Sequence, residues 1–106
     1  MVIEIDLRTS PASIELAAPD DFAAFKVLAR AHHKDADRLR SALAHIGRLG
    51  DSGHAFVPID ALECLAGERA QRSDWTASLE RMRAYADTRG WTDRGGAIRA
   101  HVEWAT

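Results

Sequence analysis

The chain has 106 residues, of which 46% are hydrophobic and 28% are charged, and these are the proportions of an ordinary globular domain. The length predicts a single domain over residues 1–106. A formal net charge of −2 argues against nucleic acid and against an anionic membrane as the partner. No stretch approaches the length of about 18 apolar residues that a bilayer span needs, so we expect no membrane partner.

Cysteine usage and the first residues indicate the compartment. Cys64 is the only cysteine, which excludes an intrachain disulfide, and the chain starts without the basic and apolar segments of a signal peptide. We therefore expect a cytoplasmic protein. Arginine far outnumbers lysine and asparagine is absent, which indicates a GC-rich bacterial genome. Because alanine supplies much of the hydrophobic content and buries little area, burial in a homodimer would supplement a thin core.

The N-terminal segment has the pattern of a β-hairpin. Residues 2–8 alternate between apolar and charged side chains, which predicts a half-buried strand. Residues 9–12 supply turn chemistry, and residues 13–18 alternate again. The two alternating segments therefore predict a pair of antiparallel strands.

Two consecutive helices are predicted next. Asp20 and Asp21 follow a proline and would cap a helix that ends at residues 32–34. Asp35 and Asp37 would begin a second helix, which ends around residues 47–50. The apolar positions at helical spacing are Phe22, Phe25, Leu28, Ala29 and His32 in the first helix, and Leu39, Leu43 and Ile46 in the second.

The following segment predicts a strand and two more helices. Residues 54–59 form the strand, and Asp60 and Glu63 have the spacing of a capping box for a short helix over residues 60–67. A longer helix over residues 73–89 is capped by Ser73 or Asp74, and its stripe is Trp75, Leu79, Met82, Tyr85 and Ala86. Gly90 is expected to end it in the left-handed conformation and to lay Trp91 against the last turn.

The last strand, over residues 97–104, completes an α+β fold. Its order is strand, strand, helix, helix, strand, helix, helix, strand, and we expect four short helices on a small, mostly antiparallel sheet. The N- and C-terminal strands are expected to be neighbours or to form the edges of the sheet, where they would pair between identical chains.

One side of the last strand carries the best candidate site. Period-two spacing places Arg99, His101 and Glu103 together on one face, where a histidine between a guanidinium and a carboxylate suits ligand binding or acid–base work. Glu4, Asp6 and Glu15 would join them if the hairpin is adjacent in the sheet. The alternative is a solvated face with cross-strand ion pairs. The other face would hold Ile98, Ala100, Val102 and Trp104.

The remaining candidates carry weaker signals. His33 and Asp37 are four residues apart but lie across a predicted helix break, so we assign no metal site and no cofactor. Cys64 has no neighbouring base in the sequence and is interpreted as a buried structural thiol. No glycine-rich phosphate loop is present. The aromatic residues are assigned to the core, and Trp104 would anchor a partner chain if its ring is uncovered.

Three functions follow from these patterns. The first is a small interaction or accessory protein that associates with itself or with another protein. The second is a small-molecule-binding protein or an enzyme that uses Arg99, His101 and Glu103. The third is a winged-helix-like DNA-binding protein in which Arg81, Arg83 and Arg89 approach the duplex, and the near-neutral charge of that region weighs against it. The sequence assigns no catalytic residue.

Overall fold

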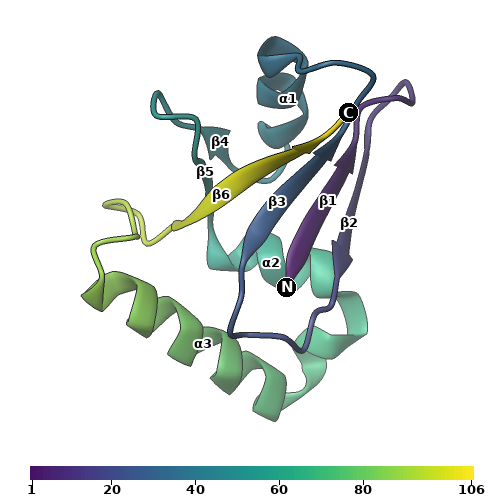
Figure 1. Cartoon of the computed structure of the whole chain (residues 1–106). Helices are drawn as coiled ribbons and strands as arrows, with labels where there is room; N and C mark the ends of the chain where they lie inside the picture. Colours follow the sequence, from purple (N-terminus) through teal and green to yellow (C-terminus); the bar gives the residue numbers. More distant parts are fainter.

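The computed structural model describes residues 1–106 and has an α+β fold with a six-stranded sheet and three α-helices (Figure 1). No helix is both long enough and apolar enough to cross a membrane. The elements in chain order are β1 (Val2–Asp6), β2 (Ser13–Ala17), β3 (Lys26–Arg30), α1 (Ala36–Leu43), β4 (Arg48–Leu49), β5 (Ala55–Val57), α2 (Ile59–Ala66), the 3-10 helix η1 (Gly67–Gln71), α3 (Ser73–Thr88) and β6 (Ile98–Ala105).

The sheet is mixed, and its strand order is β2-β1-β3-β6-β5-β4. β1 pairs with β2, β4 with β5, and β5 with β6 in antiparallel fashion, whereas β3 is parallel to both β1 and β6. The expectation of a mostly antiparallel sheet is therefore correct for three of the five pairings and wrong for the central two. Parallel pairing needs crossover connections, and here the crossovers are the segment after β2 and the long helical segment before β6.

Both terminal strands lie inside the sheet, which corrects the prediction that they are neighbours or edges. β3 separates β1 from β6, and the edges are β2 and the two-residue strand β4. The predicted β1–β2 hairpin is confirmed. The chain then crosses the start of β1, where the amino group of Met1 donates hydrogen bonds to the carbonyl oxygens of Asp21 at 2.7 Å and Ala24 at 2.8 Å. This crossing delivers β3 to the far side of β1.

Residues 26–30 form a strand, and the helix predicted from Asp20 to residues 32–34 is wrong. Lys26, Leu28 and Arg30 alternate with Val27 and Ala29, which are both 0% exposed. The apolar residues of this segment fit both the period of two of a strand and the period of 3.6 of a helix. The segment forms a strand because it pairs with β1 on one side and with β6 on the other. The number of α-helices therefore falls from the predicted four to three.

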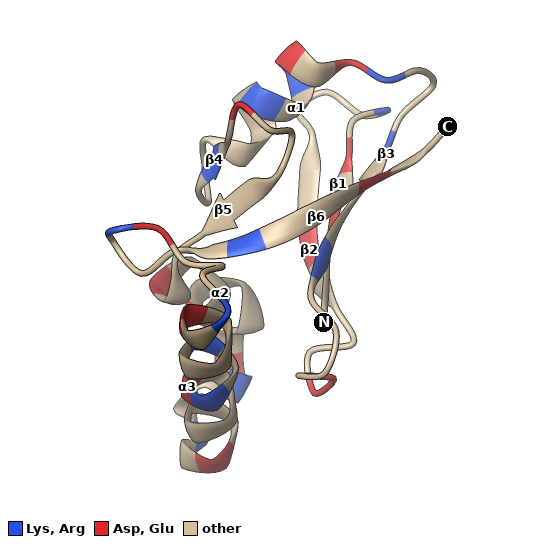
Figure 2. Ribbon diagram, turned by 60° about the vertical axis from the view of Figure 1, so that its left-hand side comes forward, with Lys and Arg blue, Asp and Glu red and all other residues tan.

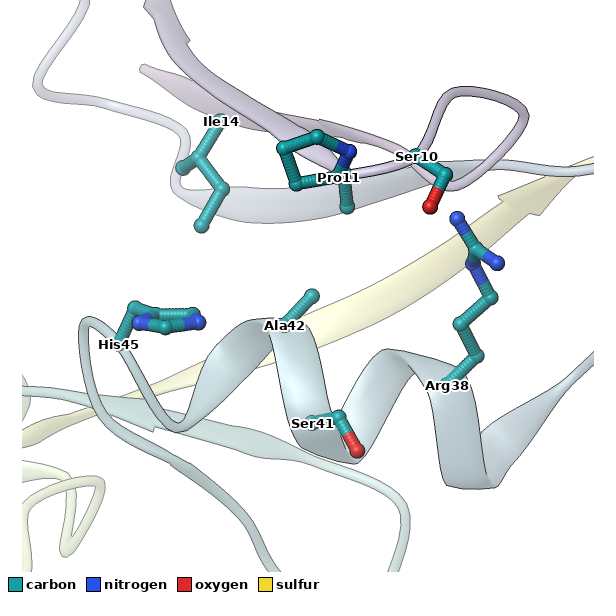
Figure 3. Close-up of a pocket in the computed structure, with 8 residues that line it drawn as sticks. Ser10, Pro11, Ile14, Arg38, Ser41, Ala42 and His45 are labelled. Carbon is teal, nitrogen blue, oxygen red and sulfur yellow. The ribbon is translucent and has the colours of Figure 1, made fainter.

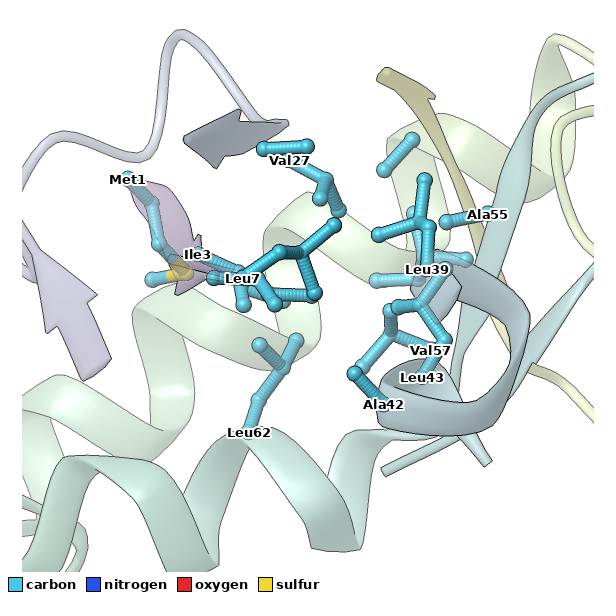
Figure 4. Packing of buried hydrophobic residues seen from close by; sticks show 14 of the residues in the cluster. Met1, Ile3, Leu7, Val27, Leu39, Ala42, Leu43, Ala55, Val57 and Leu62 are labelled. Carbon is cyan, nitrogen blue, oxygen red and sulfur yellow. The ribbon is translucent and has the colours of Figure 1, made fainter. Parts of the chain in front are cut away.

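The core lies on one side of the sheet. The alternate residues Ile3, Ile5, Val27, Val57 and Ala100 are buried there. α1 and α2 cover this side, and α3 runs along the end at which β1, β3 and β6 start (Figure 1). Figure 4 shows the packing between the two layers, with Leu62 of α2 and Leu39 and Leu43 of α1 directed at the strands. Every fully buried residue is hydrophobic.

The helix termini agree with the sequence only in part. Asp35 caps α1 as predicted, since its side chain accepts a hydrogen bond from the Arg38 amide. The capping box at Asp60 and Glu63 is wrong, because α2 starts at Ile59 after Pro58 and no side chain caps it. Pro58, whose φ is fixed by its ring, occupies the N-cap position of α2. Asp60 therefore lies inside the first turn instead of capping it. Arg72, not Ser73 or Asp74, occupies the cap position of α3.

The C-terminal end of α3 has the predicted geometry. Gly90 has a φ of 73°, a value that L side chains rarely adopt. The Gly90 amide donates to the Asp87 carbonyl and the Trp91 amide donates to the Ala86 carbonyl, and these two bonds define a Schellman motif. The chain therefore leaves the helix in a fixed direction, and this direction places Trp91 beside the sheet.

Candidate binding surface

The side of the sheet opposite the helices is uncovered, and we call it the open face. In Figure 1 α2 lies behind the strands, α3 below them and α1 above them, and in Figure 2 charged residues of both signs appear along the strands. The strand registers place alternate side chains on this face. They include Glu4, Asp6, Glu15, Lys26, Leu28, Arg30, Arg48, Phe56, Arg99, His101 and Glu103.

The structure brings the three predicted site residues together on the open face. Arg99, His101 and Glu103 are all exposed, and they follow one another along β6 between β3 and β5. Ile98 and Ala100 on the other side are buried, while Val102 and Trp104 are half-buried against the core. The predicted division of β6 into two faces is therefore what the structure has.

Glu103 is already engaged by a neighbouring strand. Lys26 donates a hydrogen bond of 2.9 Å from Nζ to Glu103 Oε2. This bond lowers the pKa of Glu103, and the charge of Lys26 adds to the effect. A carboxylate that stays ionised suits charge pairing better than proton transfer near neutral pH.

His101 lies beside a second histidine. In the sheet register His101 stands opposite Lys26, and on its other side its ring centroid is 6.4 Å from that of His54. Ser52 lies 3.0 Å from His54 Nδ1 and orients that ring. No carboxylate forms a hydrogen bond with His101. The histidine pair therefore lies beside the Lys26–Glu103 ion pair and donates no hydrogen bond to its carboxylate.

Arg99 belongs to a row of alternating cations and aromatic rings, which we call the arginine–aromatic ladder: Arg89, Trp91, Arg99, Phe56 and Arg48. The Arg89 and Arg99 guanidinium carbons lie 5.3 and 6.0 Å from the Trp91 ring centroid. Phe56 stands opposite Arg99 in the β5–β6 register, and the Arg48 guanidinium lies 4.2 Å from the Phe56 ring centroid. Neither Arg89 nor Arg99 has a carboxylate partner or a side-chain hydrogen bond.

The turn before β6 positions one end of the ladder. Asp93 Oδ1 accepts hydrogen bonds of 2.9 Å from the amides of Gly95 and Ala97, and Oδ2 lies 3.2 Å from Nη2 of Arg48. The hydrogen bond from the Ala97 amide is the main cause that lowers the pKa of Asp93, and the bond from Arg48 acts in the same direction. Arg48 is therefore the one ladder arginine whose charge is balanced.

Local structure also fixes Trp91. Its amide closes the Schellman motif of α3, and its carbonyl oxygen accepts a hydrogen bond of 2.7 Å from the Arg99 amide. The Trp91 ring packs edge-on against Tyr85, with the ring centroids 6.0 Å apart. Tyr85 itself is 59% exposed, so its assignment to the core was wrong. Trp91 is half-buried.

The hairpin side of the open face differs from the ladder side. Glu4, Asp6 and Glu15 lie on the same face as His101, as expected for a shared sheet, but β3 intervenes. Glu4 pairs with Arg30 at 2.7 Å, and Asp6 pairs with Arg8 at 2.9 Å. These pairs leave Glu15 as the one unpaired carboxylate of the hairpin side, whereas the unpaired charges of the ladder are positive.

The other sequence candidates do not form a site of the predicted kind. Cys64 is exposed, which contradicts its interpretation as a buried thiol: Leu62 is the one fully buried residue of α2, and Cys64 lies outside the set of α2 residues that pack against the core. His33 lies 4.0 Å from Asp35 rather than beside Asp37. No three His, Cys, Asp or Glu side chains surround a common metal position.

The predicted turn across residues 93–96 is present, and an antiparallel bridge between Thr92 and Ile98 closes it. β6 does not stand apart as the strand of a wing, because it continues between β3 and β5 in the main sheet. Arg83 is bound to Glu80, and Arg81 donates to Ser78. Arg89 is directed to Trp91.

Sequence reasoning found Arg99 but missed its neighbours in the ladder. Trp91 was assigned to the core, and Arg48 and Phe56 were not singled out. Their only local signal is the placement of Phe56 between the buried Ala55 and Val57, which indicates an outward side chain. The pairing of β5 with β6 is non-local and carries no such signal.

No protein-family model matches the chain, and neither a curated protein nor a solved structure matches it.

Proposed function

We propose that this protein is a small interaction protein that binds an acidic segment of a partner protein on the open face, over the arginine–aromatic ladder. The observation that carries the proposal is the state of Arg89 and Arg99. Both guanidinium groups are exposed, both lie over the ring of Trp91, and neither has a carboxylate partner.

The composition of the ladder favours a protein partner. Arginine and aromatic residues are enriched in the energetically important part of protein interfaces. An arginine that already rests on an aromatic ring loses less side-chain entropy on binding than a free one. Each exposed cation–π contact contributes about 0.5–1 kcal/mol, which is enough to restrict the guanidinium without satisfying its donors.

The charge of the ladder favours an acidic segment. Three guanidinium groups are present and only Arg48 has a carboxylate beside it, so two positive charges remain unbalanced. His54 and His101 extend this part of the face without adding negative charge. Carboxylates can form bidentate hydrogen bonds with guanidinium groups, and these are among the strongest hydrogen bonds at protein surfaces.

Catalysis at Arg99, His101 and Glu103 has less support. The Glu103 carboxylate is already hydrogen-bonded to Lys26. None of Arg99, His101 and Glu103 lines any of the five main pockets of the structure. Self-association stays a prediction, and its expected route through the terminal strands is lost because both lie inside the sheet. A second copy would offer the ladder only one open-face carboxylate without an ion pair, Glu15. A distinct acidic partner therefore fits better.

The test is calorimetric titration of the whole chain with poly-L-glutamate, with poly-L-lysine of equal length for comparison. We expect poly-L-glutamate to bind, more weakly as salt increases, and Arg99→Glu to weaken binding about tenfold or more, which equals about 1.4 kcal/mol. Arg81→Glu is the matched control, because it makes the same charge change on α3 outside the ladder. Equal losses in the two variants, or preferential binding of poly-L-lysine or of single-stranded RNA, would contradict the proposal.

A further inference from the structure

A second candidate site lies away from the open face, between the β1–β2 turn and α1. It is a pocket of about 220 Å³, and we call it the hairpin pocket (Figure 3). Pro11 and Ile14 form the wall on the hairpin side, and Ala42 forms the wall on the helix side. The guanidinium of Arg38 and the hydroxyl of Ser10 lie at one end, and the ring of His45 lies at the other.

Arg38 is incompletely paired. Its Nη2 donates a hydrogen bond to the carbonyl oxygen of Thr9. Its Nε is buried and has no hydrogen-bond partner. Buried donors are almost always satisfied in native proteins, and this unpaired donor belongs to a guanidinium that lines the hairpin pocket.

The charge around Arg38 indicates an anionic acceptor. No aspartate or glutamate lines the hairpin pocket. Arg38 forms no ion pair, whereas Arg40 on the same helix lies 3.0 Å from Asp37. A guanidinium that is partly removed from water and lacks a counter-charge favours a carboxylate with two oxygens.

The shape and lining limit the rest of the ligand. Pockets for drug-sized ligands occupy about 300–1,000 Å³, and the hairpin pocket is smaller. Its middle is lined by the aliphatic groups of Pro11, Ile14 and Ala42. An inorganic anion would leave these groups without contacts, whereas a short hydrocarbon body would cover them.

We propose that the hairpin pocket binds a small organic carboxylate, with its oxygens on Arg38 and its apolar body between Ile14 and Ala42. The site is independent of the ladder, because no residue is shared between them. A ligand here would join the hairpin to α1 and would therefore stabilise the edge of the sheet at β2.

The test uses benzoate as the probe, with benzamide as a neutral molecule of the same shape. We expect benzoate to shift amide signals of residues 9–14 and 38–45 in the ¹⁵N spectrum of the whole chain. Benzamide should bind more weakly than benzoate by a factor of about ten or more. Arg38→Gln should weaken benzoate binding to the level of benzamide. Arg40→Gln is the matched control and should leave it unchanged.

Arg38→Lys guards against loss of the fold, because lysine keeps the positive charge and the aliphatic stem of the side chain. It should bind benzoate more weakly than the native chain, since an ammonium lacks the two-pronged geometry. Benzoate shifts that are absent, that lie outside these two segments, that benzamide reproduces, or that survive unchanged in the Arg38 variants would each overturn the proposal.

Discussion

Because β3 is a central strand of the sheet, its two adjacent residues Val27 and Leu28 face opposite sides and should respond differently to substitution. Val27 is 0% exposed on the core side, whereas Leu28 is half-buried on the open face. In Val27→Ala, removing two methyl groups costs about 1.6 kcal/mol at about 0.8 kcal/mol each. A residual cavity of about 40 Å³ adds about 1 kcal/mol. We therefore expect a loss of about 2–3 kcal/mol, or about 10–20 °C in Tm.

Leu28→Lys is expected to be tolerated. In the register Leu28 stands between Glu4 and Glu103, so the new ammonium meets two carboxylates and no helix. The free energy of unfolding should stay within about 1 kcal/mol of the native value. Urea denaturation of both variants, followed by circular dichroism, gives the comparison. If Leu28→Lys unfolds the protein while Val27→Ala does not, residues 26–30 are packed as the helix that the apolar spacing suggested, and the fold described above is wrong.

Other consequences can be measured on the same protein. Asp93→Ala removes the acceptor of two turn amides and the partner of Arg48, so urea denaturation should show a loss of about 1–2 kcal/mol; no loss would mean that the turn holds itself. The Arg8 side chain lowers the pKa of Asp6 to about 2, below its ordinary value of 3.8, so this contribution to stability is complete above pH 4 and disappears as the pH falls toward 2; a carboxyl ¹³C titration with an unshifted midpoint would refute it. Cys64 is exposed and should react with a thiol reagent in the folded protein, whereas reaction only after unfolding would show that it is covered. Light scattering tests the predicted self-association, and a monomer at high concentration would end it.

Local signals explain which parts of the fold the sequence predicted correctly. The hairpin, the two faces of β6 and the end of α3 at Gly90 each depend on residues close together in the chain. Alternation defines a strand face without knowledge of its partners, and a glycine with positive φ ends a helix wherever that helix packs. These features therefore survive in any tertiary arrangement.

The central strand shows where such signals fail. Asp20 and Asp21 precede residues 22–32, and apolar residues follow at helical intervals within this segment. Local propensity therefore favours a helix. In the folded protein Val27 and Ala29 are buried between β1 and β6, which come from opposite ends of the chain. The free energy of that non-local burial exceeds the local preference, and no window of sequence contains it.

The binding surface follows the same division. The alternation along β6 correctly grouped Arg99, His101 and Glu103. The contact of Arg99 with Trp91 depends on the exit angle of α3, and its position opposite Phe56 depends on the β5–β6 register; both are tertiary. The sequence therefore predicted which residues of β6 lie on the open face, but it did not predict the arginine–aromatic ladder.

Chemical-shift mapping with ¹⁵N-labelled protein and poly-L-glutamate decides which side of the molecule binds an acidic chain. We predict that the largest shifts fall in β5, in β6 and at the indole of Trp91, while α1 and α2 stay unperturbed. Shifts concentrated in the helices, with β5 and β6 unchanged, would contradict the assignment of the open face as the binding surface.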